Sequence, residues 1–203
     1  MSFAENLGGQ LARPRGIAGW LLGEAMDIAN RKPVKVALDL LDAKPGQHIL
    51  DAGCGTGEAL RRLAQRVRCE AAGIDPSQTM IAAARRKLGR NVPLACSTIE
   101  DWPESGRYDG ILALNVLYFC TPDGAMISAL RRMLKPGGRL VAYVSDRRAM
   151  EGWSFTGAGH HRLYDKTELT DALCDAGFAP GNVNVQVGRV ARSVTGLWAT
   201  ATL

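Results

Sequence analysis

Short apolar runs alternate with segments in which apolar side chains recur every three or four residues between positions 46 and 144. A short run bounded by turn residues predicts a buried strand, and the three-to-four spacing predicts a helix with one face against the core. Strands that alternate with helices are typical of a parallel α/β sheet with right-handed crossovers. The glycine pair after Pro136 predicts a turn before the fifth strand. The expected strands cover residues 47–51, 71–75, 92–96, 108–114 and 139–144, and the expected helices cover residues 58–66, 77–88 and 123–134. Ser77 is expected to be the N-cap of the second of these helices.

The segments on either side of this alternating region have different patterns. Residues 168–176 predict a helix. Residues 183–187 and 197–202 alternate apolar and polar side chains with period two, which predicts an antiparallel strand pair. The sequence therefore predicts a parallel sheet of five strands that two antiparallel strands extend. Upstream of the sheet, residues 16–30 and 33–41 predict two helices.

Three glycines follow the first expected strand at alternate positions. The strand ends at Asp51, and Gly53, Gly55 and Gly57 come next. Glycine adopts backbone angles that other residues avoid and lets a ligand approach the main chain, so a glycine loop between a strand and a helix is typical of a nucleotide-type binding turn. The dinucleotide pattern G-x-G-x-x-G requires a glycine three positions after Gly55, where this chain has Glu58. The spacing thus disfavours a dinucleotide site.

The pattern G-x-G-x-G after an acidic residue resembles motif I of the class I S-adenosylmethionine-dependent methyltransferases, in particular small-molecule enzymes of the type 11 kind. The resemblance covers about residues 37–178. It implies an α/β, Rossmann-like methyltransferase fold with a mostly parallel seven-stranded sheet and a C-terminal antiparallel strand pair. It also implies S-adenosylmethionine as the cofactor and S-adenosylhomocysteine as the product. We expect a single methyltransferase domain over residues 1–203, with an N-terminal helical lid over 1–43 and a cofactor-binding core over 44–203.

The resemblance implies a cofactor role for the ends of the first two strands. Asp51 helps to position the amino group of the cofactor, and Gly53, Gly55 and Gly57 wrap its methionine portion. Asp75 lies eighteen residues beyond Gly57, at the end of the second strand. A carboxylate at this position can accept hydrogen bonds from both ribose hydroxyls.

Four further residues complete the implied cofactor site. Family members often carry Asp at the position of Thr98, which still accepts a hydrogen bond but brings no charge, and Ile99 forms an apolar wall for the adenine ring. Met80 packs either on the adenine edge or in the core. Asn115 follows the fourth strand, where the methyl group meets its acceptor in this family. The D/N-P-P-Y motif of enzymes that methylate amino groups of nucleic-acid bases and glutamine is absent, because Val116 follows Asn115.

Methyl transfer from a sulfonium requires mainly alignment of the reacting atoms and exclusion of water. A hydroxyl or acidic carbon acceptor also requires a base, and two of the three histidines, His160 and His161, lie in the loop after the fifth strand. In the family this loop and the N-terminal helices cover the acceptor. We therefore expect Tyr118, Trp153 and Phe155 to line the acceptor pocket and one of these histidines to act as the catalytic base. The alternative is that the loop side chains only pack against the sheet.

Composition narrows the range of partners. A hydrophobic share of 46% and a charged share of 22% are ordinary for a globular domain. The net charge of +5 comes largely from short basic clusters, without the aromatic interleaving of single-strand binders, so no nucleic-acid partner is expected. Five cysteines without C-x-x-C spacing suggest no zinc site, and no metal is expected. No apolar run reaches the ~18–20 residues of a membrane span and no signal peptide is visible, so we expect a cytoplasmic protein without stable membrane insertion.

These observations predict transfer of a methyl group from S-adenosylmethionine to an O, N or C nucleophile of a small organic acceptor. No appended recognition domain is expected, which favours a compact acceptor over a macromolecule. Two alternatives stay open: a lipid or quinone methyltransferase at the membrane surface, and a non-catalytic S-adenosylmethionine-binding regulatory module. We expect a monomer or a homodimer.

Overall fold

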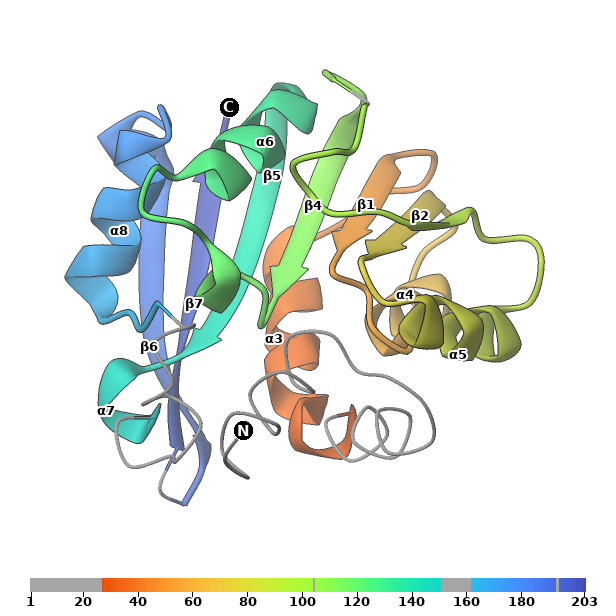
Figure 1. Ribbon diagram of the computed structural model, residues 1–203, viewed down its shortest axis with the longest axis horizontal. Helices are drawn as coiled ribbons and strands as arrows, with labels where there is room; N and C mark the ends of the chain where they lie inside the picture. Colours follow the sequence, from red (N-terminus) through yellow and green to blue (C-terminus); the bar gives the residue numbers. More distant parts are fainter. Residues whose placement is uncertain (1–26, 104, 151–161, 193) are drawn as a thin grey trace, which may run out of the picture.

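The computed structural model describes residues 27–103, 105–150, 162–192 and 194–203, which form a twisted sheet with helices on both faces (Figure 1). The strands of the sheet are β1 (His48–Ala52), β2 (Glu70–Asp75), β3 (Leu94–Cys96), β4 (Tyr108–Leu114), β5 (Leu134–Ser145), β6 (Val183–Ala191) and β7 (Val194–Thr202). The described helices are α3 (Arg31–Leu41), α4 (Glu58–Ala64), α5 (Gln78–Leu88), α6 (Ala125–Met133), α7 (Arg147–Met150) and α8 (Lys166–Asp175), with the short 3-10 helices η1 (Leu117–Phe119) and η3 (Pro180–Asn182).

The seven strands lie in the order β3-β2-β1-β4-β5-β7-β6. The pairs from β3 to β5 are parallel, and β7 is antiparallel to both of its neighbours. The structure thus confirms the predicted mostly parallel sheet with a C-terminal antiparallel strand pair. The order of the strands reverses at β1, whose neighbours are β2 and β4. In open α/β sheets, ligands bind at the carboxyl ends of the strands where the order reverses.

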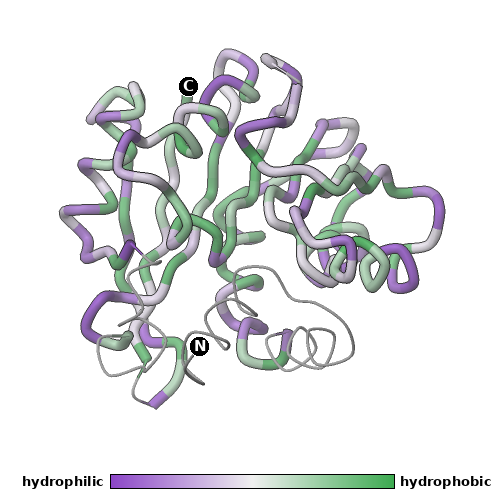
Figure 2. The backbone as a smooth tube through the Cα atoms, in the orientation of Figure 1, coloured by the Kyte–Doolittle hydropathy of each residue, from purple (hydrophilic) through white to green (hydrophobic). Residues whose placement is uncertain are grey.

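The two faces of the sheet carry separate helical layers. Ile49 packs with α3 and α4 on one face, whereas the next residue, Leu50, packs in the cluster that contains α6 and α8. Consecutive residues of a strand point to opposite faces, so the apolar runs of the central strands supply both layers. Figure 2 shows hydrophobic colour along the central strands and hydrophilic colour on outer turns. This pattern explains why the strands read as continuous apolar runs in the sequence.

The helix starts depend on local capping. The hydroxyl of Ser77 accepts a hydrogen bond from the backbone N–H of Met80 at 3.3 Å, which confirms the predicted N-cap of α5. At the start of α8, Asp165 and Glu168 form a reciprocal capping box, and the helix begins at Lys166, two residues before the predicted start. Capping thus determines these boundaries more sharply than apolar spacing does.

The predicted turn at residues 136–138 is wrong, because β5 already begins at Leu134. Leu134 pairs with Tyr108, and a register shift follows before Gly110 pairs with Arg139. Gly137 adopts a positive φ of 76° inside this irregular stretch, and its N–H donates to the carbonyl of Leu203. Glycine allows a strand to continue through a bulge, so a Pro-Gly-Gly sequence does not require the strand to end.

Helix α3 forms part of the layer that covers the sheet. Its apolar side packs against β4, β5 and β7, and the indole N–H of Trp198 donates to the carbonyl of Pro33 at 3.1 Å. Residues 31–41 of the predicted lid are therefore a layer of the core. Residues 1–26 lie outside the described part of the chain. Within the described part, no helix combines the length and apolar character that a membrane span needs.

Candidate cofactor site

The glycine loop joins β1 to α4 at the carboxyl end of the sheet. The N–H groups of Gly53 and Cys54 both donate to the carbonyl of Ile74, at 2.8 and 2.9 Å, so the loop lies against the end of β2. A Cβ added to Gly53 would lie only 2.1 Å from Cγ1 of Val116, which follows β4. Gly55 has a positive φ of 51°, and among the described residues no atom beyond its chain neighbours lies within 4 Å of its hypothetical Cβ. Gly53 therefore allows close packing, whereas Gly55 leaves open space beside the main chain.

The N–H groups of the loop donate largely within the protein. Besides those of Gly53 and Cys54, the N–H of Gly55 donates to Oδ2 of Asp75 at 3.0 Å, and that of Gly57 donates to the carbonyl of Cys54 at 2.8 Å. Phosphate-binding loops instead offer several free N–H groups to the anion. These internal hydrogen bonds disfavour a phosphate ligand at the loop, in agreement with the missing dinucleotide spacing.

Two buried carboxylates lie beside the loop. Asp51, at the end of β1, is 2% exposed, and its Oδ2 atom has no hydrogen-bond partner among the described residues. Burial, and next the negative charge of Asp75, raise the pKa of Asp51 to about 7. Burial also raises the pKa of Asp75, against the opposing effect of hydrogen bonds from the N–H groups of Ser77 and Gly55. An unpaired buried carboxylate costs free energy unless a ligand pairs with it.

This arrangement can accept hydrogen bonds from a ligand that carries donors. A carboxylate has about four lone-pair positions, and the hydrogen bonds from the N–H groups of Gly55 and Ser77 use one on each oxygen of Asp75. The carboxylate of Asp75 therefore retains capacity for two hydroxyl donors, and that of Asp51 for a cationic amine. The residues present fit the ribose diol and the amino group of the implied cofactor.

The residues predicted near the adenine ring lie at or beside the same edge. Met80, in α5, and Ile99, after β3, are both buried, and Ile99 belongs to the core cluster that contains Leu50. The hydroxyl of Thr98 donates to Oδ2 of Asp101 at 2.7 Å and accepts from the N–H of the same residue. The hydroxyl is therefore committed to a local turn in this structure.

The turn after β4 is held in an uncommon conformation. Asn115 has a positive φ of 59°, and its N–H donates to the carbonyl of Tyr143 at 2.8 Å. The hydroxyl of Tyr118 accepts a hydrogen bond from the N–H of Ser145 and lies 3.5 Å from Oδ1 of Asn115. Burial raises the pKa of Tyr118 well above its usual range. Tyr118 thus remains neutral and connects the turn to β5.

The other predicted acceptor residues, His160, His161, Trp153 and Phe155, lie outside the described residues. Described residues before and after them form hydrogen bonds with the rest of the protein. The N–H of Arg162, which directly follows the second histidine, donates to the carbonyl of Tyr118 at 2.7 Å. The N–H of Arg147 donates to the carbonyl of Tyr164 at 2.8 Å, and the hydroxyl of Tyr164 donates to the carbonyl of Leu117. Arg162 and Tyr164 therefore both bond to backbone carbonyls in or beside η1, and Arg147 bonds to Tyr164.

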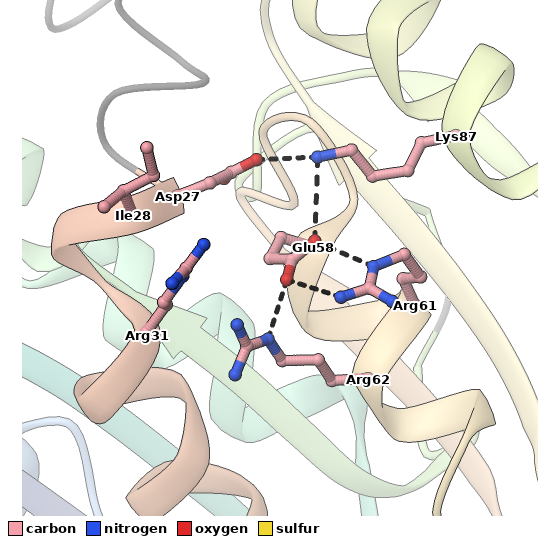
Figure 3. A pocket seen from close by; sticks show the side chains of 7 residues that line it. All are labelled: Asp27, Ile28, Arg31, Glu58, Arg61, Arg62 and Lys87. Carbon is pink, nitrogen blue, oxygen red and sulfur yellow. Dashed lines mark hydrogen bonds and ion pairs between the residues drawn. The ribbon is translucent and has the colours of Figure 1, made fainter.

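Sequence reasoning missed a group of charged side chains on the outer side of the loop. They surround a hollow of about 350 Å³, in which Lys87 lies between Asp27 and Glu58 (Figure 3). Side-chain hydrogen bonds from Arg61 and Arg62, with the charge of Lys87, lower the pKa of Glu58 to about 2 against the opposing effect of burial. The i,i+3 and i,i+4 spacing of the Glu–Arg pairs was a usable signal. The contact between Lys87 and Asp27, sixty residues apart, had none.

The described residues contain no group of three or more His, Cys, Asp or Glu side chains that could hold a metal ion. This finding covers residues 27–103, 105–150, 162–192 and 194–203 alone.

Comparisons with known sequences agree with the predicted motif. The model of a family described as the methyltransferase domain matches residues 49–138. The ubiquinone biosynthesis O-methyltransferase of Bradyrhizobium sp. (strain ORS 278) is 35% identical over 127 residues, which cover 60% of this chain and 48% of the relative. The trans-aconitate 2-methyltransferase of Acidovorax sp. (strain JS42) is 34% identical over 126 residues, which cover 62% of this chain and 48% of the relative. The chain spans about half the length of these curated relatives.

Solved structures share the fold over most of the chain. A Haloferax volcanii methyltransferase, solved in complex with a methyltransferase activator, has a TM-score of 0.76 at 18% identity and covers 89% of this chain and 92% of its own. The magnesium protoporphyrin IX methyltransferase of Synechocystis PCC 6803, solved with bound S-adenosylhomocysteine, has a TM-score of 0.69 at 21% identity. The match covers 86% of this chain and 83% of the Synechocystis chain. The chain is thus similar in sequence to the methyltransferase domain over residues 49–138, and over most of its length it shares the fold of solved S-adenosylmethionine-dependent methyltransferases.

Proposed function

We propose that the protein transfers a methyl group from S-adenosylmethionine to an O, N or C nucleophile of a small organic acceptor. The observation that carries this proposal is the buried Oδ2 atom of Asp51, which lies beside Asp75 and has no hydrogen-bond partner in the described part of the chain, at a loop whose N–H groups largely donate internally. Such a site favours a ligand with a cationic amine and hydroxyl donors over a phosphate. S-adenosylmethionine has both kinds of donor.

In this proposal the cofactor contacts fall on residues from four strand ends. Asp51 pairs with the ammonium group, Asp75 accepts from the ribose hydroxyls, and the open space beside Gly55 receives the methionine portion. Asn115 lies on the methyl side. The adenine ring lies near the remaining predicted residues, which are Met80, Thr98 and Ile99. Structures solved with bound S-adenosylhomocysteine and sharing this fold support the assignment.

The cofactor supplies a methyl group that is already activated by a positively charged sulfur. The residues of the chain then have to orient the acceptor in line with that carbon and exclude water. The acceptor donates an electron pair to the methyl carbon, the bond from carbon to sulfur breaks, and a protonated acceptor releases a proton. We assign the removal of that proton to His160 or His161, with Trp153, Phe155 and Tyr118 around the acceptor. The hydrogen bond from the N–H of Arg162, the residue after His161, to the carbonyl of Tyr118 supports this assignment.

The choice of a small acceptor is supported by the names of the relatives. They include a trans-aconitate 2-methyltransferase and a structurally similar 1,6-didemethyltoxoflavin-N1-methyltransferase of Burkholderia thailandensis, which has a TM-score of 0.68 at 21% identity and covers 83% of this chain and 77% of its own. The proposal retains three further predictions: a cytoplasmic location, a monomeric or homodimeric state, and no nucleic-acid partner.

Isothermal titration with S-adenosylhomocysteine, followed by a mass-spectrometric screen of small acceptors with S-adenosylmethionine, tests the proposal. The screen includes hydroxylated quinone rings, small carboxylic acids and nitrogen heterocycles. Binding and a product heavier by one methylene unit are the expected results. No binding to the wild-type protein would overturn the proposal. Binding without product from any acceptor would favour the non-catalytic regulatory module instead.

A second candidate is a quinone or lipid methyltransferase that works at the membrane surface. Several curated relatives are named ubiquinone biosynthesis O-methyltransferases, at 32–35% identity. Ile28, beside the charged hollow, exposes 64% of its surface, which supplies one apolar contact for such a surface. Co-sedimentation with vesicles of anionic lipid separates the two candidates: sedimentation favours the membrane enzyme, and a protein that stays in the supernatant favours a freely diffusing acceptor.

A further inference from the structure

A buried threonine of the glycine loop bonds to an ion pair on the outer side of the loop. The hydroxyl of Thr56, whose residue is 2% exposed, lies 2.6 Å from Oδ2 of Asp27. The ammonium group of Lys87 lies 2.7 Å from the same oxygen and 3.1 Å from the threonine hydroxyl. Three parts of the chain therefore meet at one carboxylate oxygen: the residues before α3, the glycine loop and α5. We refer to Asp27, Thr56 and Lys87 as the outer clamp.

The outer clamp differs from an ordinary surface ion pair. The side chains of Lys87 and Asp27 are 20% and 21% exposed, whereas those of Lys35 and Asp39, an ion pair on α3, are 66% and 50% exposed. Charges that are partly removed from water interact more strongly and are screened less by salt than exposed charges. Figure 3 shows the ammonium group of Lys87 directed at the carboxylates of Asp27 and Glu58. The clamp is therefore able to restrain the part of the chain that it contacts.

The restrained part is next to the ligand side of the loop. Thr56 directly follows Gly55, whose N–H donates to Asp75 on the inner side. Glycines allow many backbone conformations, so a loop with three of them requires restraint from outside to keep one conformation. Asp75 restrains the inner side of the loop, and the clamp restrains the outer side one residue later.

We propose that Asp27 and Lys87 are positioning residues that act through Thr56 to hold the glycine loop in its cofactor-binding conformation. Neither residue contacts the cofactor in this arrangement, and both raise its affinity by reducing the conformational freedom that binding would otherwise remove. The proposal rests on the proposed function, since it concerns the affinity for the same cofactor. Because linkage is reciprocal, bound cofactor also strengthens the clamp.

The test compares variants of the clamp by isothermal titration with S-adenosylhomocysteine. Thr56→Val removes the hydroxyl at nearly constant shape, and Lys87→Met removes the ammonium group. Each is expected to weaken binding roughly tenfold, a coupling typical of residues within one polar network. Thr56→Ser keeps the hydroxyl, and Lys35→Met removes a matched but exposed lysine. Both controls are expected to stay within about twofold of the wild type.

Two further measurements separate positioning from simple loss of stability. The double variant Asp27→Asn/Lys87→Met is expected to lose less affinity than the sum of the two single losses, because both changes break one pair. Hydrogen exchange of the Gly55 and Thr56 amides without ligand is expected to be faster in Lys87→Met and unchanged in Lys35→Met. If Lys87→Met does not fold, the milder Asp27→Asn takes its place in the titration and in the exchange measurement, and the double variant becomes Asp27→Asn/Thr56→Val.

The outcomes distinguish this proposal from the proposed function. A wild-type protein that does not bind S-adenosylhomocysteine contradicts the proposed function, and amide exchange then still decides whether the clamp restrains the loop. Normal wild-type binding with unchanged affinity in Thr56→Val and Lys87→Met overturns the positioning role and leaves the cofactor site intact. Equal losses in Thr56→Ser and Thr56→Val overturn it as well, because the hydroxyl would then be irrelevant.

Discussion

Acidic side chains on the two sides of the glycine loop have very different surroundings. On the inner side, burial raises the pKa of Asp51 to about 7, and its Oδ2 atom has no partner among the described residues. On the outer side, Glu58 receives hydrogen bonds from Arg61 and Arg62, and its pKa falls to about 2. The two residues are only seven positions apart.

This difference indicates that the acid on the inner side binds a ligand, whereas the acid on the outer side stabilises the fold. A carboxylate that already has several cationic partners stabilises the fold and has little left to offer a ligand. A buried carboxylate without a partner destabilises the empty protein and gains most when a donor arrives.

Replacing the inner acid Asp51 with asparagine is expected to have the largest effect. The variant keeps the shape of the side chain but loses the charge that pairs with the ammonium group, which costs about 100-fold in affinity when the pair is buried. Isothermal titration with S-adenosylhomocysteine measures the loss. The matched control is Asp39→Asn on the exposed side of α3, which should bind as the wild type does. Equal affinities of the wild type and Asp51→Asn would contradict the assignment of the inner acid to ligand binding.

Asp75→Ala is expected to weaken cofactor binding by about 30-fold, close to 2 kcal/mol, which is the size of a lost charge-assisted hydrogen bond. The change removes the acceptor for the ribose hydroxyls and also the acceptors of the Gly55 and Ser77 N–H groups. Titration with adenosine tests the ribose contact separately, because adenosine lacks the amino acid portion. A variant that binds adenosine normally would contradict the ribose assignment.

The free energy of unfolding of the ligand-free protein should depend on pH through the raised pKa of Asp51. Its folded pKa of about 7 lies above the ordinary value of 3.8, so the folded state binds more protons than the unfolded state between these values. Stability is therefore lost as the pH rises from about 4 to about 7, and no further loss follows above that. Asp51→Asn avoids this loss and is expected to be about 1–2 kcal/mol more stable than the wild type at pH 8. Urea unfolding between pH 4 and pH 8 measures the difference, and a variant less stable at every pH would contradict the unpaired state of this carboxylate.

Glu58→Gln is expected to have the smallest effect and the opposite dependence on pH. The folded pKa of about 2 lies below the ordinary value of 4.5, so the stabilisation is present above about 4.5 and is lost as the pH falls toward about 2. The glutamine variant is expected to be about 0.5–1 kcal/mol less stable than the wild type at pH 7, because the pairs are only partly buried. Urea unfolding at pH 7 and pH 3 checks this, and a loss of equal size at both values would show that charge is not the cause.

Most of the fold follows from local pattern, because the central strands and their helices are strongly periodic. The seven strands and the antiparallel end were predictable for this reason, and Ser77 was recognised as a helix cap. The turn predicted at residues 136–138 failed because pairing of Leu134 with Tyr108 continues β5 through a bulge. Whether a glycine ends a strand or bends it depends on partners that the local sequence does not contain.

In the candidate site, too, some features follow from local sequence and others depend on contacts between distant residues. The glycine spacing and the position of Asp75 were readable from motif distances, and the structure brings both to one edge of the sheet. The N-cap Ser77 was readable too, but the bond between Asp75 and Gly55 was not, since it joins residues twenty positions apart. The contact of Lys87 with Asp27 depends on how α5 and the residues before α3 meet, which only the folded chain determines.

The internal hydrogen bonds of the loop N–H groups have a consequence for the design of inhibitors. A compound aimed at this site should keep a basic amine and a vicinal diol, because the carboxylates of Asp51 and Asp75 can accept from both. A phosphate or sulfonate group would gain little, because the N–H groups of Gly53, Gly55 and Gly57 already have acceptors in the protein. The same compound should therefore discriminate against proteins whose glycine loops bind nucleotide phosphates through free N–H groups.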